Sequence, residues 1–270
     1  MTVADRRARF QALHAGARLF VMPNPWDAGS ARLFASFGFE ALATTSAGFA
    51  LSLGRLDQNV SPDELVVHVE VLAAATSLPL NVDSERCYPD DPGGVGETVA
   101  LLAEAGAPGC SIEDYDPVAN GIDDVAVATE RVGEAAEAAH RLPAPLVLTA
   151  RAENHLHGID ELDDTISRLL AYRGAGADVV YAPGLKDLDQ IRAVVEAVGI
   201  PVNVLALRGG PAIGELASVG VRRVSTGSLP AVAAYGVLKA ASAELLTDGT
   251  STYGAGAVSN DELRKAFAAD

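Results

Sequence analysis

A glycine that stands just before a short apolar segment recurs along the whole chain, and it constrains the fold more than any other feature. Gly38, Gly106, Gly176, Gly199 and Gly220 each occupy such a position, after a segment with helical character. Glycine often ends helices because it adopts the left-handed backbone conformation without a Cβ penalty. The predicted repeating unit is therefore a helix, a glycine stop, a strand, and a loop into the next helix.

This unit yields eight strand candidates, at residues 19–24, 40–46, 79–84, 109–114, 146–152, 178–183, 201–206 and 222–227. They are near-continuous apolar runs, as expected for parallel strands that are covered on both faces. Eight such strands alternating with helices predict an α/β fold, a (β/α)8 or TIM barrel. A doubly wound open sheet is the alternative. It would normally carry a nucleotide-binding glycine loop after its first strand, where this chain has Pro23-Asn24-Pro25.

Two segments flank the predicted barrel. A short amphipathic helix is expected at residues 4–15, and a long apolar helix at residues 230–246 follows the eighth strand. Residues 247–259 are rich in Gly, Ser and Thr, and residues 260–267 predict a final helix that Asn260 caps. We expect residues 1–246 to form the barrel with its N-terminal helix. Residues 247–270 are expected to form a C-terminal extension that packs on the barrel or on a neighbouring subunit.

Carboxylates end two consecutive strand candidates. Asp83 and Glu85 end the third strand, and Glu113 ends the fourth. The chemistry of a parallel α/β barrel lies at the C-terminal ends of its strands. Carboxylates crowded there repel one another unless a cation joins them, and Mg²⁺ or Mn²⁺ with oxygen ligands is the usual solution. The pattern predicts a divalent metal site at these three acids. The plainer alternative is that they are helix caps and surface acids.

Charge and composition restrict the partners. The formal net charge of −16 disfavours nucleic acid and anionic membrane surfaces. Cys87 and Cys110 form no zinc-binding pattern, and we expect them to stay reduced in a cytoplasmic protein. Residues 1–16 lack the apolar core of a signal peptide, and no run of about 18 apolar residues predicts a membrane span. A small-molecule substrate is therefore the expected partner.

Other strand ends supply candidate substrate contacts. Trp26 after the first strand could wall a small pocket, or it could simply pack. Ser46 and the small residues Ala47 and Gly48 could present hydroxyl and backbone N–H donors to a carboxylate, although ordinary turn chemistry explains them equally well. Arg151 could form a bidentate contact with a substrate carboxylate, or it could pair with Glu113 or Glu153.

Two further candidates lie near these positions. Asn203 on the seventh strand could offer an amide contact to the substrate. His155, in the loop after the fifth strand, could act as a general acid or base, as could His157.

Six motifs occur in a characteristic order: Asn24-Pro25-Trp26-Asp27, Thr45-Ser46-Ala47-Gly48, Gly54-Arg55-Leu56-Asp57, Asp83-Ser84-Glu85, Ile112-Glu113-Asp114 and Ala150-Arg151-Ala152-Glu153. In this order the chain resembles the isocitrate lyase/phosphoenolpyruvate mutase superfamily over nearly its whole length. The resemblance implies a (β/α)8 barrel, Mg²⁺ dependence, and the cleavage or formation of bonds next to a 2-oxo acid through an enolate. It also implies exchange of C-terminal helices between subunits, which favours a homodimer or homotetramer.

The resemblance assigns roles to individual residues. Asp57, Asp83, Glu85 and Glu113 would hold the metal, and Ser46, its neighbouring backbone amides and Arg151 would hold the oxo-acid carboxylate. Two departures stand out. Lyases of the family carry a Lys-Lys-Cys-Gly-His segment in the gating loop, whereas this chain continues from Glu113 with Asp-Tyr-Asp-Pro-Val-Ala-Asn-Gly-Ile. Glu85 also stands where the best-known members have Asp.

These observations predict a Mg²⁺-dependent lyase that cleaves a C–C bond in, or decarboxylates, a small 2-oxo or 2-hydroxy carboxylate. Arg151 would stabilise developing charge. An aldol-type cleavage also needs a base, for which Tyr115, His155 and Glu113 are the candidates. One alternative is a phosphonopyruvate-type mutase or hydrolase that acts on a C–P bond. Another is a non-catalytic barrel that binds an oxo acid.

Overall fold

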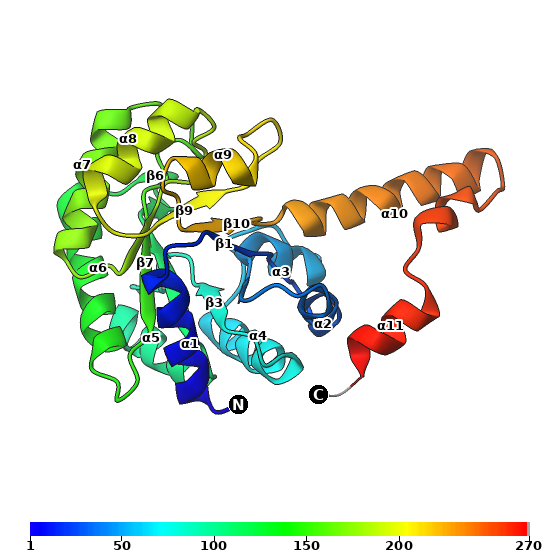
Figure 1. Ribbon diagram of the computed structural model, residues 1–270, viewed down its shortest axis with the longest axis horizontal. Coiled ribbons are helices and arrows are strands. Elements are labelled where there is room, and N and C mark those ends of the chain that lie inside the picture. The colour runs from blue at the N-terminus through cyan, green and yellow to red at the C-terminus, as the bar shows by residue number, and fades with distance from the viewer. Residues whose placement is uncertain (269–270) are drawn as a thin grey trace.

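Eight short parallel strands form the centre of the molecule (Figure 1). The computed structural model describes residues 1–268. The strands are β1 (Phe20–Met22), β2 (Leu42–Ala43), β3 (Leu80–Asp83), β4 (Gly109–Glu113), β7 (Val147–Arg151), β8 (Val179–Tyr181), β9 (Val202–Leu205) and β10 (Arg223–Ser225). Each lies within one of the eight predicted segments.

The order of the strands around the sheet is β1-β10-β9-β8-β7-β4-β3-β2. The backbone N–H of Ala43, the last residue of β2, donates to the carbonyl of Pro23 just after β1 at 3.1 Å, which joins the two end strands. The sheet is thus nearly closed, and the barrel prediction is confirmed over the open-sheet alternative.

Helices surround the strands: α1 (Val3–Ala15), α2 (Ala28–Ser36), α3 (Ser46–Ser52), α4 (Pro62–Ala75), α5 (Gly94–Glu104), α6 (Val125–His140), α7 (Leu162–Gly174), α8 (Leu188–Val198) and α9 (Ile213–Ser218). Local sequence explains their ends. Ser61 and Glu64 form a reciprocal capping box at the start of α4. Gly199 ends α8 in the left-handed conformation, with φ of 64°. The predicted glycine stop is therefore present at this position.

A two-stranded antiparallel hairpin, β5 (Tyr115–Asp116) and β6 (Gly121–Ile122), follows β4. It occupies the place of the gating loop, and its pattern was not predicted from the sequence. Asp116 builds its turn, because the carboxylate accepts the backbone N–H groups of Val118 and Ala119 at 2.8 and 3.1 Å. The base of the hairpin is held by Asp123, which pairs with Arg86 and Arg131.

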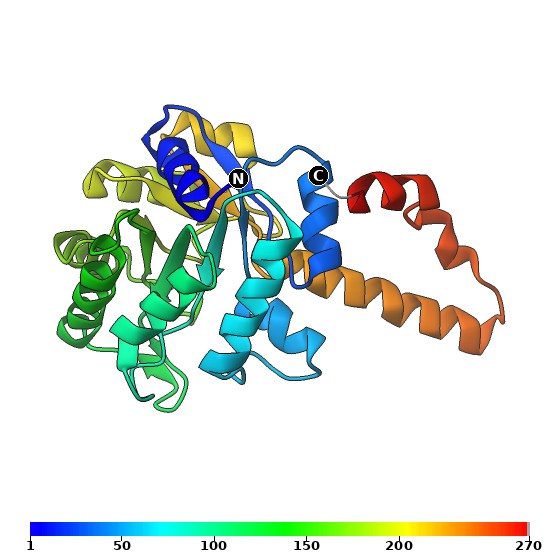
Figure 2. The same cartoon turned by 90° about the horizontal axis from the view of Figure 1, so that it is seen from below.

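The C-terminal extension leaves the barrel and turns back toward it (Figures 1 and 2). Helix α10 (Leu229–Thr247) projects outward, and after the short 3-10 helix η1 (Thr252–Gly256) the helix α11 (Asn260–Phe267) packs beside α2. Ser259, rather than the predicted Asn260, caps α11. Among residues 1–268, α10 is the one helix long and apolar enough to cross a membrane by length and composition, and little of it is buried.

Candidate active site

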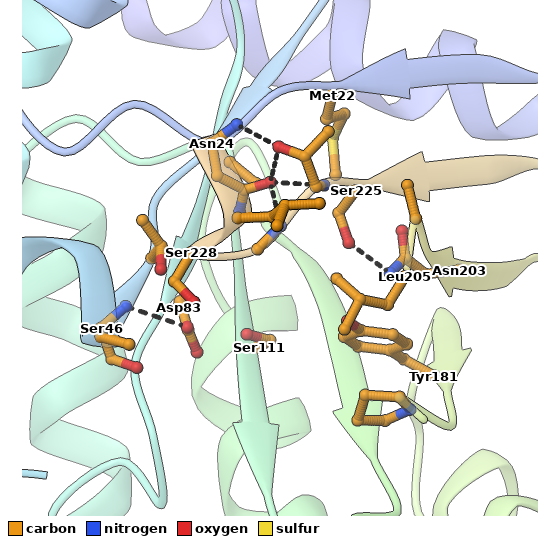
Figure 3. Close-up of a pocket in the computed structure, with 18 of the residues that line it drawn as sticks. Met22, Asn24, Ser46, Asp83, Ser111, Tyr181, Asn203, Leu205, Ser225 and Ser228 are labelled. Carbon is orange, nitrogen blue, oxygen red and sulfur yellow. Dashed lines mark hydrogen bonds between the residues drawn. The ribbon is translucent and has the colours of Figure 1, made fainter. Parts of the chain in front are cut away.

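A pocket of about 470 Å³ opens at the carboxyl ends of the barrel strands (Figure 3). Met22, Asp83, Arg151, Tyr181, Leu205 and Ser225, the terminal residues of β1, β3, β7, β8, β9 and β10, line it. Residues from the loop after β2 complete one wall, including Ser46, Ala47 and Asp57. The pocket therefore lies where a parallel barrel places its chemistry.

Arg151 is the centre of the charged network in this pocket. Its guanidinium contacts Asp83 Oδ1 at 2.6 Å, Glu113 Oε2 at 3.1 Å and Glu153 Oε1 at 2.8 Å. The ladder between β4 and β7 sets this arrangement, because Glu113 lies directly opposite Arg151 in the register. Arg151 was expected either to pair with Glu113 or Glu153 or to contact a substrate carboxylate. These two roles are compatible, because Arg151 pairs with the acids and also lines the pocket.

Two of the acids resist ionisation. Burial, together with the charges of Asp83 and Asp57, raises the pKa of Glu85 to about 8. Burial raises the pKa of Glu113 well above its ordinary value, although Arg151 opposes the shift. A buried carboxylate oxygen of Glu85, Oε1, has no hydrogen-bond partner among the described residues. Acids that repel one another and retain an unpaired oxygen are suited to a divalent cation.

The four predicted metal ligands are close in the fold but are not assembled as ligands. In residues 1–268, no three His, Cys, Asp or Glu side chains stand together closely enough to hold a metal ion. Arg151 contacts both Asp83 and Glu113, and the amide of Gln58 donates to Glu113 Oε1 at 2.9 Å. Asp57 and Asp83 line the pocket, whereas Glu113 does not and Glu85 lines a different one. The donor set is chemically suited to Mg²⁺, and the assignment of these four ligands stays a prediction.

The backbone near the acids is strained. Gln58, Glu85, Cys87 and Tyr88 have φ values of 62°, 49°, 57° and 46°, in the left-handed region that non-glycine residues rarely occupy. Gln58 contacts Glu113, and the carbonyl of Glu85 accepts the backbone N–H of Glu113 at 2.9 Å. Such strain is typical of segments whose side chains must be held in particular places.

Ser46 begins α3, and its predicted role as a donor to a substrate carboxylate stays a prediction. Its N–H donates to Asp83 Oδ2 at 3.1 Å, and Figure 3 shows the two residues side by side at the pocket wall. Ala47 also lines the pocket. Gly48 does not line it, because its N–H donates to the hydroxyl of Thr45 as part of the cap of α3.

Asn203 lines the pocket, but its amide is engaged by protein groups. Its side-chain nitrogen donates to Ser225 Oγ at 2.9 Å, and its oxygen accepts from Arg223 Nε at 2.9 Å. Arg223 is buried in the barrel and also contacts His14 and Thr149, both neutral partners. Burial lowers the pKa of Arg223 to about 9. Sequence analysis missed this arginine, because it begins a strand rather than ending one.

Three candidates lie outside the pocket. Trp26 lines a separate apolar groove between α2, α3 and α4. His155 is buried, with Nδ1 at 3.1 Å from Asp160 and Nε2 at 3.1 Å from the hydroxyl of Thr165.

The third is Tyr115. Its hydroxyl donates to Asn120 Oδ1 at 2.8 Å, and its ring stacks on His157. The predictions that Trp26 borders the substrate and that His155 or Tyr115 serves as a base find no support in this geometry.

The two cysteines are buried and free. Burial raises the pKa of Cys87 to about 12, so its thiol stays protonated at neutral pH. Neither cysteine lines the pocket, and neither substitutes for the cysteine absent from the hairpin. The sequence analysis also passed over Lys186 and Arg208, which line the pocket from the loops after β8 and β9. Their position after strand ends is the signal that could have identified them.

Comparison with known proteins gives three consistent matches. The sequence model of the phosphoenolpyruvate phosphomutase family matches residues 10–246. An oxaloacetate decarboxylase of Bradyrhizobium is 30% identical over 263 residues, covering 89% of this chain and 86% of the relative. The crystal structure of a lyase/mutase from Burkholderia cenocepacia is 50% identical and superposes with a TM-score of 0.94, covering 99% of this chain and 97% of that one.

The fold alone is shared with a more distant protein. A phosphonopyruvate hydrolase, whose crystal structure contains oxalate and Mg²⁺, is 22% identical with a TM-score of 0.84. The alignment covers 98% of this chain and 95% of the hydrolase.

Proposed function

Because this chain belongs to the phosphoenolpyruvate phosphomutase family, within the isocitrate lyase/phosphoenolpyruvate mutase superfamily, we propose that it is a Mg²⁺-dependent lyase. Its substrate is a small 2-oxo or 2-hydroxy carboxylate, and the reaction breaks a C–C bond next to the oxo group through an enolate. Among such reactions, decarboxylation fits the pocket best.

The observation that carries this proposal is the network around Arg151 at the rim of the barrel. A guanidinium shared by Asp83, Glu113 and Glu153 is held rigidly at the pocket wall. Arg151 would bind the carboxylate of an oxo acid and keep the substrate in one orientation. Ser46 and Ala47, at the start of α3, line the same pocket, and the N–H of Ser46 helps to hold Asp83 in place.

The metal would be held by Asp57, Asp83, Glu85 and Glu113, some of them through water. Mg²⁺ bound there would act as a Lewis acid that stabilises the negative charge developing on the oxo acid. The unpaired Oε1 of Glu85 and the raised pKa values of Glu85 and Glu113 support a cation at this position.

The lining residues favour decarboxylation over an aldol-type cleavage. No His or Cys lines the pocket in the described part of the chain, and the hairpin offers Tyr115 only in contact with Asn120 and His157. An aldol-type lyase needs a base beside the departing hydroxyl, whereas carbon dioxide leaves without one. The 30% identity to an oxaloacetate decarboxylase supports the same choice.

The test measures the melting temperature with oxalate, with and without Mg²⁺, and then the products from a panel of 2-oxo acids. Oxalate is planar and dianionic like the enolate of pyruvate, so a site built for that enolate should bind it. Stabilisation that needs both ligands, followed by release of carbon dioxide or pyruvate, would support the proposal. Release of phosphate from phosphonopyruvate would instead favour C–P chemistry. Binding without any turnover would favour a non-catalytic barrel.

A further inference from the structure

Tyr181 is the one tyrosine among the described residues that line the active-site pocket. It ends β8, and only 8% of its side chain is exposed. It lies directly opposite Arg151 in the register of β7 and β8, and the guanidinium of Arg151 lies over its ring, 5.4 Å from the centroid. Because Arg151 would bind the oxo-acid head, the phenol borders the place where the head would lie.

A buried cation behind Tyr181 begins a chain of directed hydrogen bonds. Arg223 is 2% exposed, and the three partners of its guanidinium are neutral: His14, Thr149 and Asn203. His14 Nδ1 lies 2.8 Å from the carbonyl of Phe10 and carries the hydrogen, so Nε2 accepts from Arg223 at 3.1 Å. An arginine has donors only, and Arg223 therefore sets the direction of every bond that follows.

Asn203 and Ser225 continue this chain toward the pocket (Figure 3). Asn203 Oδ1 accepts from Arg223 Nε at 2.9 Å, so its amide nitrogen faces the other way and donates to Ser225 Oγ at 2.9 Å. The amide cannot turn over, because its own N–H groups would then face those of the guanidinium. Ser225 ends β10 and accepts this bond, which leaves its hydroxyl hydrogen for another acceptor.

The phenol oxygen of Tyr181 is that acceptor. Burial raises the pKa of Tyr181, whereas the charge of Arg151 and a hydrogen bond from Ser225 lower it. The effect of burial prevails, so the phenol stays protonated at neutral pH. Since its oxygen accepts from Ser225, its own hydrogen is left to point into the pocket. The chain that begins at Arg223 thus presents one proton at the pocket wall.

The proposed decarboxylation needs such a proton. When carbon dioxide leaves, the electron pair of the broken bond stays on C3 of the substrate and forms the enolate. C3 must then gain a proton to give the 2-oxo acid product. Of the other acids that line the pocket, Asp57 and Asp83 would hold the metal, and Lys186 is exposed in the loop after β8.

We propose that Tyr181 donates the proton that converts the enolate into the product, and that Arg223, Asn203 and Ser225 are positioning residues that direct this proton into the pocket. The C3–H bond forms as the phenol O–H bond breaks, and the phenolate then regains a proton from the solvent. Arg151 and the hydroxyl of Ser225 stabilise the transient phenolate. The inference rests on the proposed function, because it assumes an enolate bound at Arg151.

Stereochemistry shows whether a protein group or the solvent protonates the enolate. In D₂O with Mg²⁺, decarboxylation of 3-methyloxaloacetate gives 2-oxobutanoate with one deuterium at C3. Immediate reduction to 2-hydroxybutanoate prevents exchange, and NMR then measures the two configurations at C3. The wild-type protein should give one configuration. In Tyr181→Phe the ratio should fall from about 100:1 to about 1:1, since a positioned acid contributes about 100-fold over solvent.

Tyr235→Phe is the matched control. It loses a hydroxyl that donates to the carbonyl of Leu51 at 3.0 Å, and it does not line the pocket. This control should keep one configuration. Tyr181→Phe should still bind oxalate with Mg²⁺ to within about threefold of the wild type, because the contacts to the head are intact. One configuration from Tyr181→Phe would overturn the inference. Loss of oxalate binding would overturn it too, because Tyr181 would then hold the site rather than donate a proton.

Asn203→Asp separates positioning from structural support. The new carboxylate faces Arg223 and removes the N–H that Ser225 accepts, so the hydrogen of Ser225 should turn away from Tyr181. The added ion pair should maintain or raise the melting temperature. In contrast, kcat should fall about tenfold with an unchanged KM, as expected for the loss of one hydrogen bond in the transition state. A wild-type kcat with one configuration at C3 would exclude the positioning roles.

The wild-type protein separates this inference from the proposed function. If it binds oxalate with Mg²⁺ and releases carbon dioxide but gives both configurations equally, the inference is wrong and the proposed function stands. If it binds no oxalate and releases no carbon dioxide from any 2-oxo acid, the proposed function is wrong and the inference falls with it.

Discussion

At the scale of single residues, the site is dominated by one buried arginine and the acids that surround it. The positive charge of Arg151 compensates the negative charges of Asp83, Glu113 and Glu153, and these carboxylates compensate the guanidinium in turn. Removing one partner of a buried ion pair leaves an uncompensated charge, which costs more than the pair itself contributes. Arg151 is therefore expected to stabilise the barrel as well as to bind substrate.

Arg151→Met should lower the free energy of unfolding by about 3–5 kcal/mol, since it strands three buried carboxylates. Urea titration followed by circular dichroism would measure this change. Arg55→Met is the control: Arg55 pairs with Glu64 on the surface, and its loss should cost less than about 1 kcal/mol. Equal effects of the two substitutions would show that the ion pairs of Arg151 contribute no more to the free energy of unfolding than a surface ion pair does.

Burial of His68 makes the stability of the folded protein fall in acid. Its ring stacks on Phe49, its Nε2 is buried without a partner in the described residues, and burial lowers its pKa from 6.5 to about 4. The folded state therefore binds this proton less readily than the unfolded chain does. The stability due to neutral His68 is complete above pH 6.5 and declines as the pH falls toward about 4.

His68→Leu should remove this part of the acid sensitivity. Between pH 7 and pH 4, the wild-type protein should lose about 3 kcal/mol more stability than the variant, on the scale of 1.36 kcal/mol per pKa unit. Urea midpoints measured at several pH values would show the difference. Parallel profiles for His68→Leu and wild type would contradict the assignment.

The sequence predicted residue types at the site better than it predicted their contacts. Asp83, Arg151 and Ser46 line the pocket because a strand end fixes the direction of a side chain. Trp26, Tyr115 and His155 do not, because each finds a partner within its own loop or groove, and such partners are invisible in a linear pattern. Arg223 was missed because it begins β10, whereas the candidates were sought at strand ends.

At the scale of elements, the glycine and strand pattern predicted all eight barrel strands, since covered parallel strands need continuous apolar runs. The hairpin of β5 and β6 escaped prediction because its strands are only two residues long and its turn depends on Asp116. The hairpin is anchored to the barrel through Asp123, Arg86 and Arg131. These ion pairs favour a fixed cover beside the site rather than a loop that delivers a catalytic group.

Helix α10 exposes more apolar surface than a lone chain would favour. Val232, Val237, Leu238 and Leu246 are 49%, 59%, 61% and 87% exposed. Helical spacing spreads these residues around α10, so the helix is apolar on all sides, and exposed apolar surface of this extent marks an interaction surface. We propose that a second copy of the chain covers it in a homodimer or homotetramer. The sequence prediction placed residues 230–246 in the barrel and expected subunit contacts only from residues 247–270, whereas α10 projects from the barrel in the structure.

Leu238→Glu should shift the assembly toward monomers, because it places a charge within the exposed apolar surface of α10. Sedimentation velocity across a range of concentrations would measure the mass. Val127→Glu is the control: Val127 is an exposed apolar residue on α6, remote in the fold from α10, and its replacement should leave the mass unchanged. A wild-type protein that stays monomeric at high concentration would exclude the proposed assembly.

At the scale of the whole molecule, a net charge of −16 combines with a dense group of acids at one end of the barrel. Self-repulsion destabilises the compact state, and any added salt relieves part of it. The barrel closes around acidic side chains that repel one another, so any salt should raise the stability of the folded chain by screening. If the metal assignment holds, divalent cations should raise it further by binding.

These two responses can be separated. At matched ionic strength, NaCl should raise the melting temperature only through screening, whereas MgCl₂ should add the free energy of binding, about 2.7 kcal/mol at a concentration 100 times the dissociation constant. For a chain of this size that corresponds to roughly 5–10 °C. Differential scanning calorimetry would measure both shifts.

Asp83→Asn provides the decisive comparison. It removes one charge of the acid group, so its response to NaCl should change little, while most of the additional Mg²⁺ stabilisation should disappear. Glu196→Gln, an exposed acid on α8, is the matched control and should retain the full response to Mg²⁺. If Mg²⁺ and NaCl act alike on the wild-type protein, the acids at the barrel rim bind no metal. Their crowding would then serve only to hold Arg151.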